Sequence, residues 1–496
     1  MKVENSGYKD AFKATALFGG VQIVTILISV LKSKVVAIWL GTTGFGILSL
    51  FGAATNLIFS ISNLGIQSSA VRDIANAQSA NDDLLVSKIV KAVNRWVLAT
   101  GLGGAIITIA ISPWLSEWLF KSNKYLLSFI FLSSFILLTG IYNGHYAILQ
   151  GIRKLKFMAK ANVFGAIAGF VCSVPMFYFF REDGIVWALI LTALSTTVVS
   201  YFYVRKVKLI PVKQTYKESY ILGLKTVKLG IMMAISGIAV LLVQFAIKTF
   251  IVRLDGLSDV GLYQAGWVLN TTYLGMIFSA MGKDYFPRLS QTVDDWQKTN
   301  SKINEQAEIA ILILAPLIIG MIVFMPFLIK VFYSQEFIDI IPMTKWLLIG
   351  SLIKAGSWGI SFIFLAKGDG KVFLFNELGI LLVTLPSYLY GYYWFGLVGI
   401  GYAFMLCYVI YFIWVSIVAF RKYNIFYESQ FWKIFFVMLT LLLIYPVSEY
   451  FWSVKYITGI VLILCIFGYS LYELNSRVNF KLIIKNILNK YGTRKK

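Results

Sequence analysis

The sequence has few charged residues for its length. Only 14% of its 496 residues are Asp, Glu, Lys or Arg, whereas 58% are hydrophobic, and the mean hydropathy is +0.76. Soluble globular proteins carry about 25% charged residues. The composition therefore excludes a soluble protein and predicts a chain that crosses a membrane many times.

Acidic residues are the scarcer kind of charge. The chain has 23 Asp and Glu against 45 Lys and Arg, which gives a formal net charge of +22. Such a balance is typical of nucleic-acid-binding proteins, but these cations lie in short segments between hydrophobic runs, as the positive-inside rule expects. We therefore expect no nucleic-acid partner.

Residues and motifs that carry chemistry are also rare. The three cysteines (Cys172, Cys407 and Cys465) lie inside hydrophobic runs without metal-site or disulfide spacing, and we interpret them as inert buried thiols. No G-x-x-x-x-G-K-[ST] phosphate loop occurs, which excludes an ATP-driven pump. The predicted outer segments are short and lack clustered acid and base groups, which argues against a membrane polymerase or ligase. We expect no cofactor and no metal.

What the sequence does have is fourteen hydrophobic runs long enough to cross a bilayer, which takes about 20 helical residues. We expect an all-α polytopic membrane protein whose spans lie at residues 14–40, 44–67, 90–112, 125–149, 158–180, 184–204, 226–252, 261–282, 306–332, 340–366, 372–394, 396–420, 431–452 and 454–474. The break near residue 395 is the weakest, because only Phe395 and Gly396 separate two runs.

Lys and Arg also predict the orientation. With the N-terminus inside, the inner segments hold most of the 45 cations, so both termini are expected in the cytoplasm. The last segment, 477–496, has apolar residues on one helical stripe and lysines on the other face. That pattern predicts an amphipathic helix at the membrane surface.

Segments about 215 residues apart resemble one another. Lys34–Leu40 (KVVAIWL) aligns with Lys248–Leu254 (KTFIVRL), and Leu149–Phe157 (LQGIRKLKF) aligns with Leu365–Phe373 (LAKGDGKVF). A repeat of six helices keeps its topology, so the halves are expected to be related by an axis along the membrane normal. The predicted parts are six-helix bundles at 1–210 and 211–425, two additional helices at 426–476 and a cytoplasmic tail at 477–496.

Lysines at membrane depth are the main candidates for function. Lys32 and Lys34 lie within the first span, and Lys248 lies at the equivalent place in the seventh. A mid-span charge costs about 2.5–3.5 kcal/mol and therefore faces protein or a watery cavity. Cations around a shared cavity would attract an anionic substrate such as a pyrophosphate. In the structural alternative Lys34 reaches an interface by snorkelling. Because Lys32 and Lys34 point to different helix faces, we expect one of them near a helix contact.

Other polar residues in the spans have both a functional and a structural interpretation. Lys354 in the tenth span is a further cavity cation or the ion-pair partner of Glu377 in the eleventh. Asn56 and Asn270 suit sugar hydroxyls, and equally suit hydrogen bonds between helices.

Three residues complete the candidates. Arg253 lies at the predicted outer mouth after the seventh span. Glu377 and His145, the only histidine, are candidates for coupling transport to an ion. A single histidine that is hydrogen-bonded within the fold is the commoner case.

Longer stretches carry a family resemblance: KVVAIWLGTTGFGILSL (34–50), LQGIRKLKFMAKANVFGAIAG (149–169) and LIGSLIKAGSWGISFIFLAKGDGKVFLFNELG (348–379). Their order and spacing resemble the Wzx-type polysaccharide flippases of the MOP superfamily over about residues 10–420. Family members often have twelve spans, and two further spans are a feature of related lipid II flippases.

This resemblance implies two six-helix bundles in a V around a central cavity that alternates access. The substrate would be an undecaprenyl-pyrophosphate-linked oligosaccharide of O-antigen type, moved from the cytoplasmic to the periplasmic leaflet of a bacterial inner membrane. Lys34, Lys248 and Lys354 would contact its pyrophosphate or acidic sugars. Membrane lipid, a glycan polymerase and a chain-length regulator are the implied further partners.

Two other functions remain as alternatives. An ion-coupled multidrug exporter of the same superfamily is disfavoured by the excess of lysines, because cationic drugs call for carboxylates. A membrane glycan polymerase is the third reading of the sequence.

Overall fold

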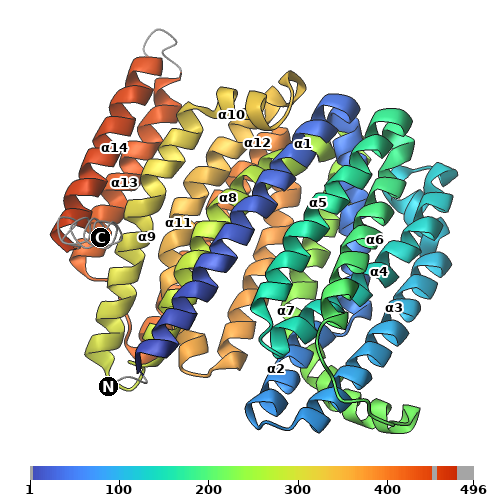
Figure 1. The fold of residues 1–496 in the computed structure, drawn as a ribbon. Coiled ribbons are helices and arrows are strands. Elements are labelled where there is room, and N and C mark those ends of the chain that lie inside the picture. Colours follow the sequence, from blue (N-terminus) through green and yellow to red (C-terminus); the bar gives the residue numbers. More distant parts are fainter. Residues whose placement is uncertain (1–3, 450–454, 478–496) are drawn as a thin grey trace, which may run out of the picture. The chain divides into compact units, whose positions relative to one another are not determined.

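The computed structural model describes the backbone of residues 4–449 and 455–477 (Figure 1). Side chains are described over the same residues except 4–19, 225–226, 228–229, 232–233 and 455. Within these ranges the chain is helical and has no strand, which confirms the all-α prediction. The predicted amphipathic tail lies outside the described residues from 478 onward.

Fourteen α-helices and three 3-10 helices follow one another in the described chain. They are α1 (Glu4–Ser62), α2 (Ile66–Ser79), α3 (Asp83–Phe120), η1 (Asn123–Tyr125), α4 (Leu126–Gly151), α5 (Leu155–Phe180), η2 (Arg181–Asp183), α6 (Gly184–Arg205), α7 (Tyr216–Leu254), α8 (Leu257–Ser290), α9 (Trp296–Val323), α10 (Met325–Phe332), η3 (Gln335–Ile340), α11 (Ile341–Ala366), α12 (Gly370–Tyr423), α13 (Ser429–Ser448) and α14 (Lys455–Arg477). Two of these, α2 with 14 residues and α10 with 8, are too short to cross a bilayer.

Two long helices contain two predicted spans each. α1 bends at Gly41 (φ 64°, ψ −163°), and α12 bends at Gly396 (φ 58°, ψ −144°). Glycine adopts this backbone without steric strain, so each glycine ends one span and begins the next. The weak break that the sequence indicates near residue 395 is therefore a bend between two helical segments without a loop.

Ten stretches of the described chain are long and apolar enough to cross a membrane. Three of them, Gly20–Ser62, Leu155–Arg205 and Gly370–Tyr423, each hold two predicted spans. Together with the less apolar α8 they account for the fourteen predicted spans. The chain is a multi-pass membrane protein.

The chain forms two compact units. Unit 1 comprises residues 1–264 and the short segment 330–337, and unit 2 comprises residues 265–329 and 338–496. Helix α8 therefore begins in unit 1 and ends in unit 2. The division that the sequence repeat predicts, with a boundary after residue 210, is a different one and stays a prediction.

Glycines let two helices of unit 1 approach closely. A Cβ atom added to Gly46 would lie 1.9 Å from the carbonyl oxygen of Leu257, and one added to Gly261 would lie 2.0 Å from the carbonyl oxygen of Thr42. α1 and the first turns of α8 therefore cross backbone to backbone. Small residues at the contact are the usual basis of helix packing in membranes.

Side-chain hydrogen bonds flank this crossing. The hydroxyls of Thr42 and Ser258 lie 2.8 Å apart, and Ser49 donates to Oε1 of Gln264 (3.1 Å). The partners are 216 and 215 positions apart in the sequence. Contacts between a residue and its own counterpart are what two-fold symmetric surfaces make.

The polar segment between α6 and α7 is held against α3. Lys91 donates to the carbonyl oxygen of Val212 (2.8 Å) and Arg95 to that of Thr215 (2.7 Å). Thr215 then begins α7 with a capping box, in which its Oγ1 accepts from the N–H of Glu218 and the carboxylate of Glu218 accepts from the N–H of Thr215. These hydrogen bonds hold the pKa of the Glu218 carboxyl below its usual value.

Unit 2 is built around α11. Leu347, Leu348 and Leu352 of this helix have no exposed surface, and α9 and α12 pack against it. α13 and α14 pack against α9 (Figure 1). The two helices beyond the predicted repeat therefore join unit 2 through α9.

Gly46→Ala should destabilise the protein, because the added methyl group would overlap the carbonyl group of Leu257. Overpacking of this kind typically costs about 1–3 kcal/mol, and we expect a lower midpoint of thermal unfolding in detergent. Gly52→Ala is the matched control, since it lies in the same helix and its added Cβ would have nothing within 4 Å. Equal midpoints for the two variants would contradict the close crossing.

Candidate functional site

Lys34 lies on α1 shortly before the bend at Gly41. Its ammonium donates to the carbonyl oxygens of Lys330 and Tyr333, within unit 1. α10 ends at Phe332, and the last carbonyls of a helix lack partners inside it. A cation at that end is also favoured by the helix dipole. In this structure Lys34 therefore acts as a cap for the end of α10.

Lys32 points to a different face of α1. Its Nζ lies 3.4 Å from Oγ1 of Thr192 on α6, and that hydroxyl donates in turn to the carbonyl oxygen of Ala188 (2.6 Å). Lys32 thus lies at the contact between α1 and α6.

Lys248 is the most buried of the candidate cations. It lies on α7 with 7% of its surface exposed. The neighbouring Thr249 donates to the carbonyl oxygen of Phe245 (2.8 Å), but no described residue makes a hydrogen bond or ion pair with the Lys248 ammonium. Burying an ammonium without a partner is costly, so an anion supplied from outside the chain would be strongly favoured beside it.

Lys354 of α11 lies near two aromatic rings. Its Nζ is 5.4 Å from the ring centre of Phe278 and 5.4 Å from that of Tyr408, an arrangement that attracts a cation. The alternative partner Glu377 instead accepts a hydrogen bond from Tyr411 (2.8 Å). Over the described residues no ion pair joins Lys354 to a carboxylate.

His145 and Asn270 take part in hydrogen bonds between helices. Nδ1 of His145 lies 2.9 Å from the hydroxyl of Ser200, which joins α4 to α6. The side-chain oxygen of Asn270 accepts from Ser351 (2.9 Å), which joins α8 to α11 in unit 2. Both residues are buried, and these bonds match the structural interpretation of polar residues in spans.

Arg253 and Asn56 lie nearer the surface of unit 1. The guanidinium of Arg253 is 4.4 Å from a ring of Trp118 on α3, and the backbone oxygen of Arg253 accepts from Lys121 (3.1 Å). Asn56 is exposed on α1. The geometry therefore gives Arg253 a packing role at the junction of α3 and α7.

The nine candidates are divided between the two units. Unit 1 contains Lys32, Lys34, Asn56, His145, Lys248 and Arg253, and unit 2 contains Asn270, Lys354 and Glu377. A single site made by all of them stays a prediction. In the described part of the chain, no group of three or more His, Cys, Asp or Glu is placed to hold a metal ion.

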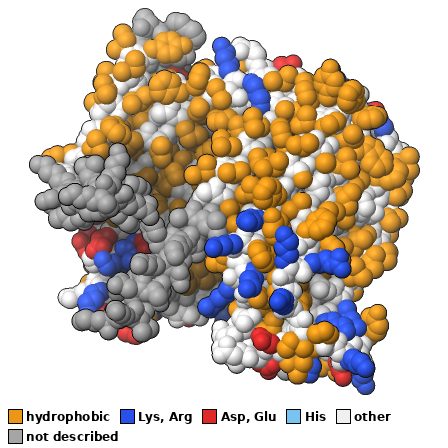
Figure 2. All heavy atoms as spheres, viewed as in Figure 1, with side chains coloured by type: hydrophobic (Ala, Val, Ile, Leu, Met, Phe, Trp, Pro, Cys, Tyr) orange, Lys and Arg blue, Asp and Glu red, His pale blue; other side chains and the backbone are white. Residues whose placement is uncertain are grey.

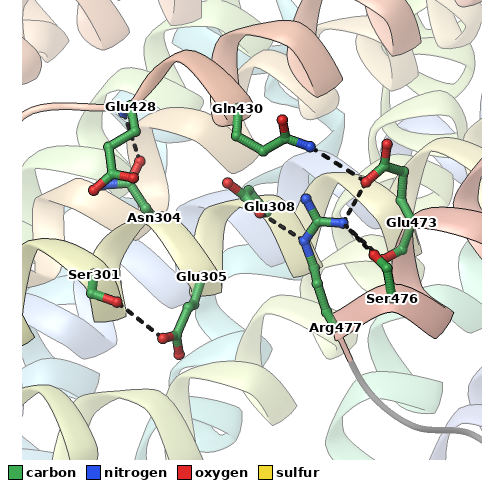
Figure 3. Close-up of polar contacts among 9 residues, drawn as sticks. All are labelled: Ser301, Asn304, Glu305, Glu308, Glu428, Gln430, Glu473, Ser476 and Arg477. Carbon is green, nitrogen blue, oxygen red and sulfur yellow. Dashed lines mark hydrogen bonds and ion pairs between the residues drawn. The ribbon is translucent and has the colours of Figure 1, made fainter.

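Figure 3 shows an ionic network in unit 2 that sequence reasoning missed. Nε of Arg477 donates to Glu308 (2.8 Å) and Nη1 to Glu473 (2.5 Å). Glu473 also accepts from Gln430 (3.4 Å). The network ties α9, α13 and α14 together. The sequence feature that could have indicated this network is Glu308, a carboxylate at the start of an otherwise apolar run.

Further polar contacts fasten the same helices. The side-chain oxygen of Asn304 accepts from the N–H of Glu428 (2.9 Å) (Figure 3). The side-chain amide of Asn304 donates to the carbonyl oxygen of Phe426 (3.1 Å). Lys345 of α11 forms an ion pair with Glu449, which follows α13. The start and the end of α13 are therefore both fixed to the rest of unit 2.

The sequence of residues 35–342 matches the family described as polysaccharide biosynthesis protein. The chain belongs to this family. The part that matches the polysaccharide biosynthesis family includes Lys248 and Asn270, whereas Lys34 and Lys354 lie outside it.

Individual proteins similar to this chain include flippases. The chain is similar to the lipid III flippase of Escherichia coli (strain K12), with 20% identity over 406 residues that cover 81% of this chain and 96% of the relative. Its fold is similar to the lipid II flippase MurJ in an inward closed conformation, with a TM-score of 0.66, 14% identity, and coverage of 93% of this chain and 99% of that one.

A second solved structure, an inward-facing multidrug resistance MATE family transporter of the MOP superfamily, is similar with a TM-score of 0.62 and 15% identity. It covers 81% of this chain, and 96% of its own chain is covered. At these identities the structures show the fold alone. With the family match they confirm the resemblance to Wzx-type polysaccharide flippases that the sequence indicates.

Arg477→Ala should destabilise the protein by about 3–5 kcal/mol, because it leaves the buried carboxylates of Glu308 and Glu473 without their cation. Thermal unfolding in detergent measures the loss. Lys302→Ala is the control: it breaks the exposed pair with Glu305 and should change stability by no more than about 1 kcal/mol. An Arg477→Ala protein as stable as this control would show that the network contributes little.

Proposed function

We propose that the protein is a flippase that moves a lipid-linked oligosaccharide from the cytoplasmic to the periplasmic leaflet of a bacterial inner membrane, with both termini in the cytoplasm. The narrower proposal is an undecaprenyl-pyrophosphate-linked repeat unit of O-antigen type. The family match and the relative named lipid III flippase support a lipid-linked saccharide as cargo. The named relatives are flippases and transporters, so the protein is a transporter and not an enzyme.

The observation that carries the proposal is positive charge at membrane depth without protein counter-charge. Lys248 is buried with no described partner, and Nζ of Lys354 lies near the rings of Phe278 and Tyr408 without a described ion pair. Lysine binds phosphate groups as a compact point charge. A pyrophosphate that reached these ammonium groups would supply the anion that the fold does not.

We also propose that two halves related by the sequence repeat alternate access to the cargo. The support is in the backbone as well as in the sequence. Gly41 and Gly256 both have a positive φ (64° and 92°), as do Arg181 and Gly396 (52° and 58°), and the members of each pair are 215 positions apart. Transporters built from such repeats work by moving one half against the other.

An ion-coupled multidrug exporter is the second candidate, because the solved MATE structure has a similar fold. Cationic drugs would call for a free carboxylate at depth, but the carboxylate of Glu377 accepts a hydrogen bond from Tyr411. Glu377 and His145 stay proposals as coupling residues. A glycan polymerase and a chain-length regulator stay proposals as partners that take over the translocated oligosaccharide.

Lys248→Ala should abolish most surface polysaccharide in cells that depend on this protein. Removing one member of a desolvated charge contact costs about 2 kcal/mol or more, which is roughly thirtyfold in affinity. Polysaccharide extracted from the cell surface is the readout, with the membrane level of the protein measured in parallel. Lys34→Ala should also lower surface polysaccharide, because it removes the cation that binds the carbonyl oxygens at the end of α10.

Lys283→Ala is the matched control, since Lys283 is an exposed lysine on α8 and should support a normal amount of polysaccharide. Normal polysaccharide in both the Lys34→Ala and Lys248→Ala strains would overturn the cationic mechanism. Increased drug susceptibility on deletion, with polysaccharide intact, would favour the exporter.

A further inference from the structure

Unit 1 carries a basic face at the predicted inner end of α4, α5 and α6. It is formed by Arg153, Lys154, Lys156, Lys160, Arg205 and Lys206, and all six side chains are exposed. Figure 2 shows Lys and Arg side chains gathered over the lower parts of α5 and α6, bordered by a broad hydrophobic surface. The face is thus a concentrated charge next to an apolar surface.

The helices that carry the basic face have no carboxylate to neutralise it. The sequence has no Asp or Glu between Glu117 and Glu182, and none between Asp183 and Glu218. Glu182 and Asp183 lie in η2, at the opposite end of α5 and α6. Among the described residues, none of the six cations takes part in an ion pair.

Aromatic rings orient part of the basic face. The guanidinium of Arg205 lies 5.2 Å from the ring centre of Tyr201, and Nζ of Lys206 lies 5.2 Å from that of Tyr203. The ring of Phe157 on α5 packs 6.0 Å from that of Tyr203, over a buried apolar cluster of α4 and α5. Arg205 and Lys206 therefore lie against aromatic rings, and the ring of Tyr203 packs on a buried apolar cluster.

Arg153 holds its place at the cost of an unfavourable backbone. Its φ is 59°, in the left-handed region, whereas in the turn of unit 2 the residue 215 positions later is Gly368, with φ 75°. The two turns close in the same way, through N–H groups of Lys154 (2.9 Å) and Asp369 (2.8 Å). Glycine adopts this backbone with less strain than arginine does, and five other non-glycine residues of the described chain also have a positive φ.

Two of the corresponding cations of unit 2, Lys367 and Lys422, have partners within the fold. Lys422 pairs with Asp369 at 3.1 Å, Tyr423 donates to the same carboxylate, and Lys367 donates to the carbonyl oxygen of Val293. The aligned turns thus share a backbone but differ in what their charges can bind. In the described chain the unit 2 turn carries a carboxylate, Asp369, that binds one of its cations, whereas none of the six cations of the unit 1 turn forms an ion pair.

We propose that the basic face binds the phosphate groups of anionic phospholipids in the inner leaflet. Phe164, Val198 and Phe202 of the same helices are exposed apolar residues, typical of a surface that meets lipid chains, and the cations lie where those helices leave it. A Lys or Arg near an anionic lipid surface contributes about 1 kcal/mol, or about fivefold in affinity. This binding does not depend on the transported cargo.

The test uses the full-length protein in a neutral detergent. Native mass spectrometry measures the binding of short-chain phosphatidylglycerol and, for comparison, short-chain phosphatidylcholine. A variant combining Arg153→Gln, Lys154→Gln, Lys156→Gln and Lys160→Gln should bind phosphatidylglycerol at least about tenfold more weakly. Its binding of phosphatidylcholine and its midpoint of thermal unfolding should not change, because the replaced side chains are exposed.

A second variant removes the same charge from the aligned region of unit 2, through Lys367→Gln, Lys371→Gln, Arg421→Gln and Lys422→Gln. It should keep phosphatidylglycerol affinity within about twofold. An equal loss in both variants would reduce the effect to net charge and overturn the proposal.

Two other results would also overturn it. Displacement of phosphatidylglycerol from the wild-type protein by inorganic pyrophosphate would assign the face to the head group of a pyrophosphate-linked cargo. Unchanged phosphatidylglycerol binding in the unit 1 variant, together with less surface polysaccharide in cells, would assign it to an acidic protein partner. Because lipid binding and polysaccharide export are measured separately, failure of this proposal is distinguishable from failure of the transport function.

Discussion

The structure depends on one constraint, which is that polar groups removed from water must find partners within the protein. Backbone N–H and C=O groups inside a bilayer can meet this demand within helices, and the described chain consists of helices joined by short turns. Where a helix must bend, as at Gly41 and Gly396, a glycine takes the left-handed backbone. Charged groups follow the same constraint: Lys34 meets helix-end carbonyls and Arg477 meets two carboxylates.

Against this background Lys248 is the informative exception. Lys248 is 7% exposed, which is comparable with Glu308 and Glu473 of the ionic network in unit 2, yet the described residues give it no anion. A structural lysine could be replaced by an apolar residue at no loss, since buried ion pairs seldom stabilise more than well-packed hydrophobic residues do. We propose that the anion that binds Lys248 is part of the cargo, a proposal that agrees with membership of the polysaccharide biosynthesis family.

The sequence predicts the spans well because hydrophobic runs report directly on the surrounding lipid, and even the bend at Gly396 is visible as a weak break between runs. It does not predict where the polar side chains find their partners. Arg477 and Glu308 are 169 positions apart, so no local pattern connects them. Lys34 bonds to backbone carbonyls, which leave no signature in residue types. His145 and Asn270 could be named as candidates, but only the hydroxyls of Ser200 and Ser351 beside them favour a structural role.

The two turns of the proposed repeat have the same backbone conformation but different charged residues around them. A left-handed residue recurs in the aligned turns at Arg153 and Gly368 because the chain must reverse there in both halves. The charges around the two turns are not under that requirement, and they differ: Asp369 binds Lys422 and Tyr423 in unit 2, whereas the basic face of unit 1 has no such carboxylate. If these cations served only to orient the chain in the membrane, either turn would do equally well, and glycine would remain the better residue at position 153. Arg153 adopts a backbone that favours glycine, and the anion that we propose for the basic face gives its charge a role at this turn.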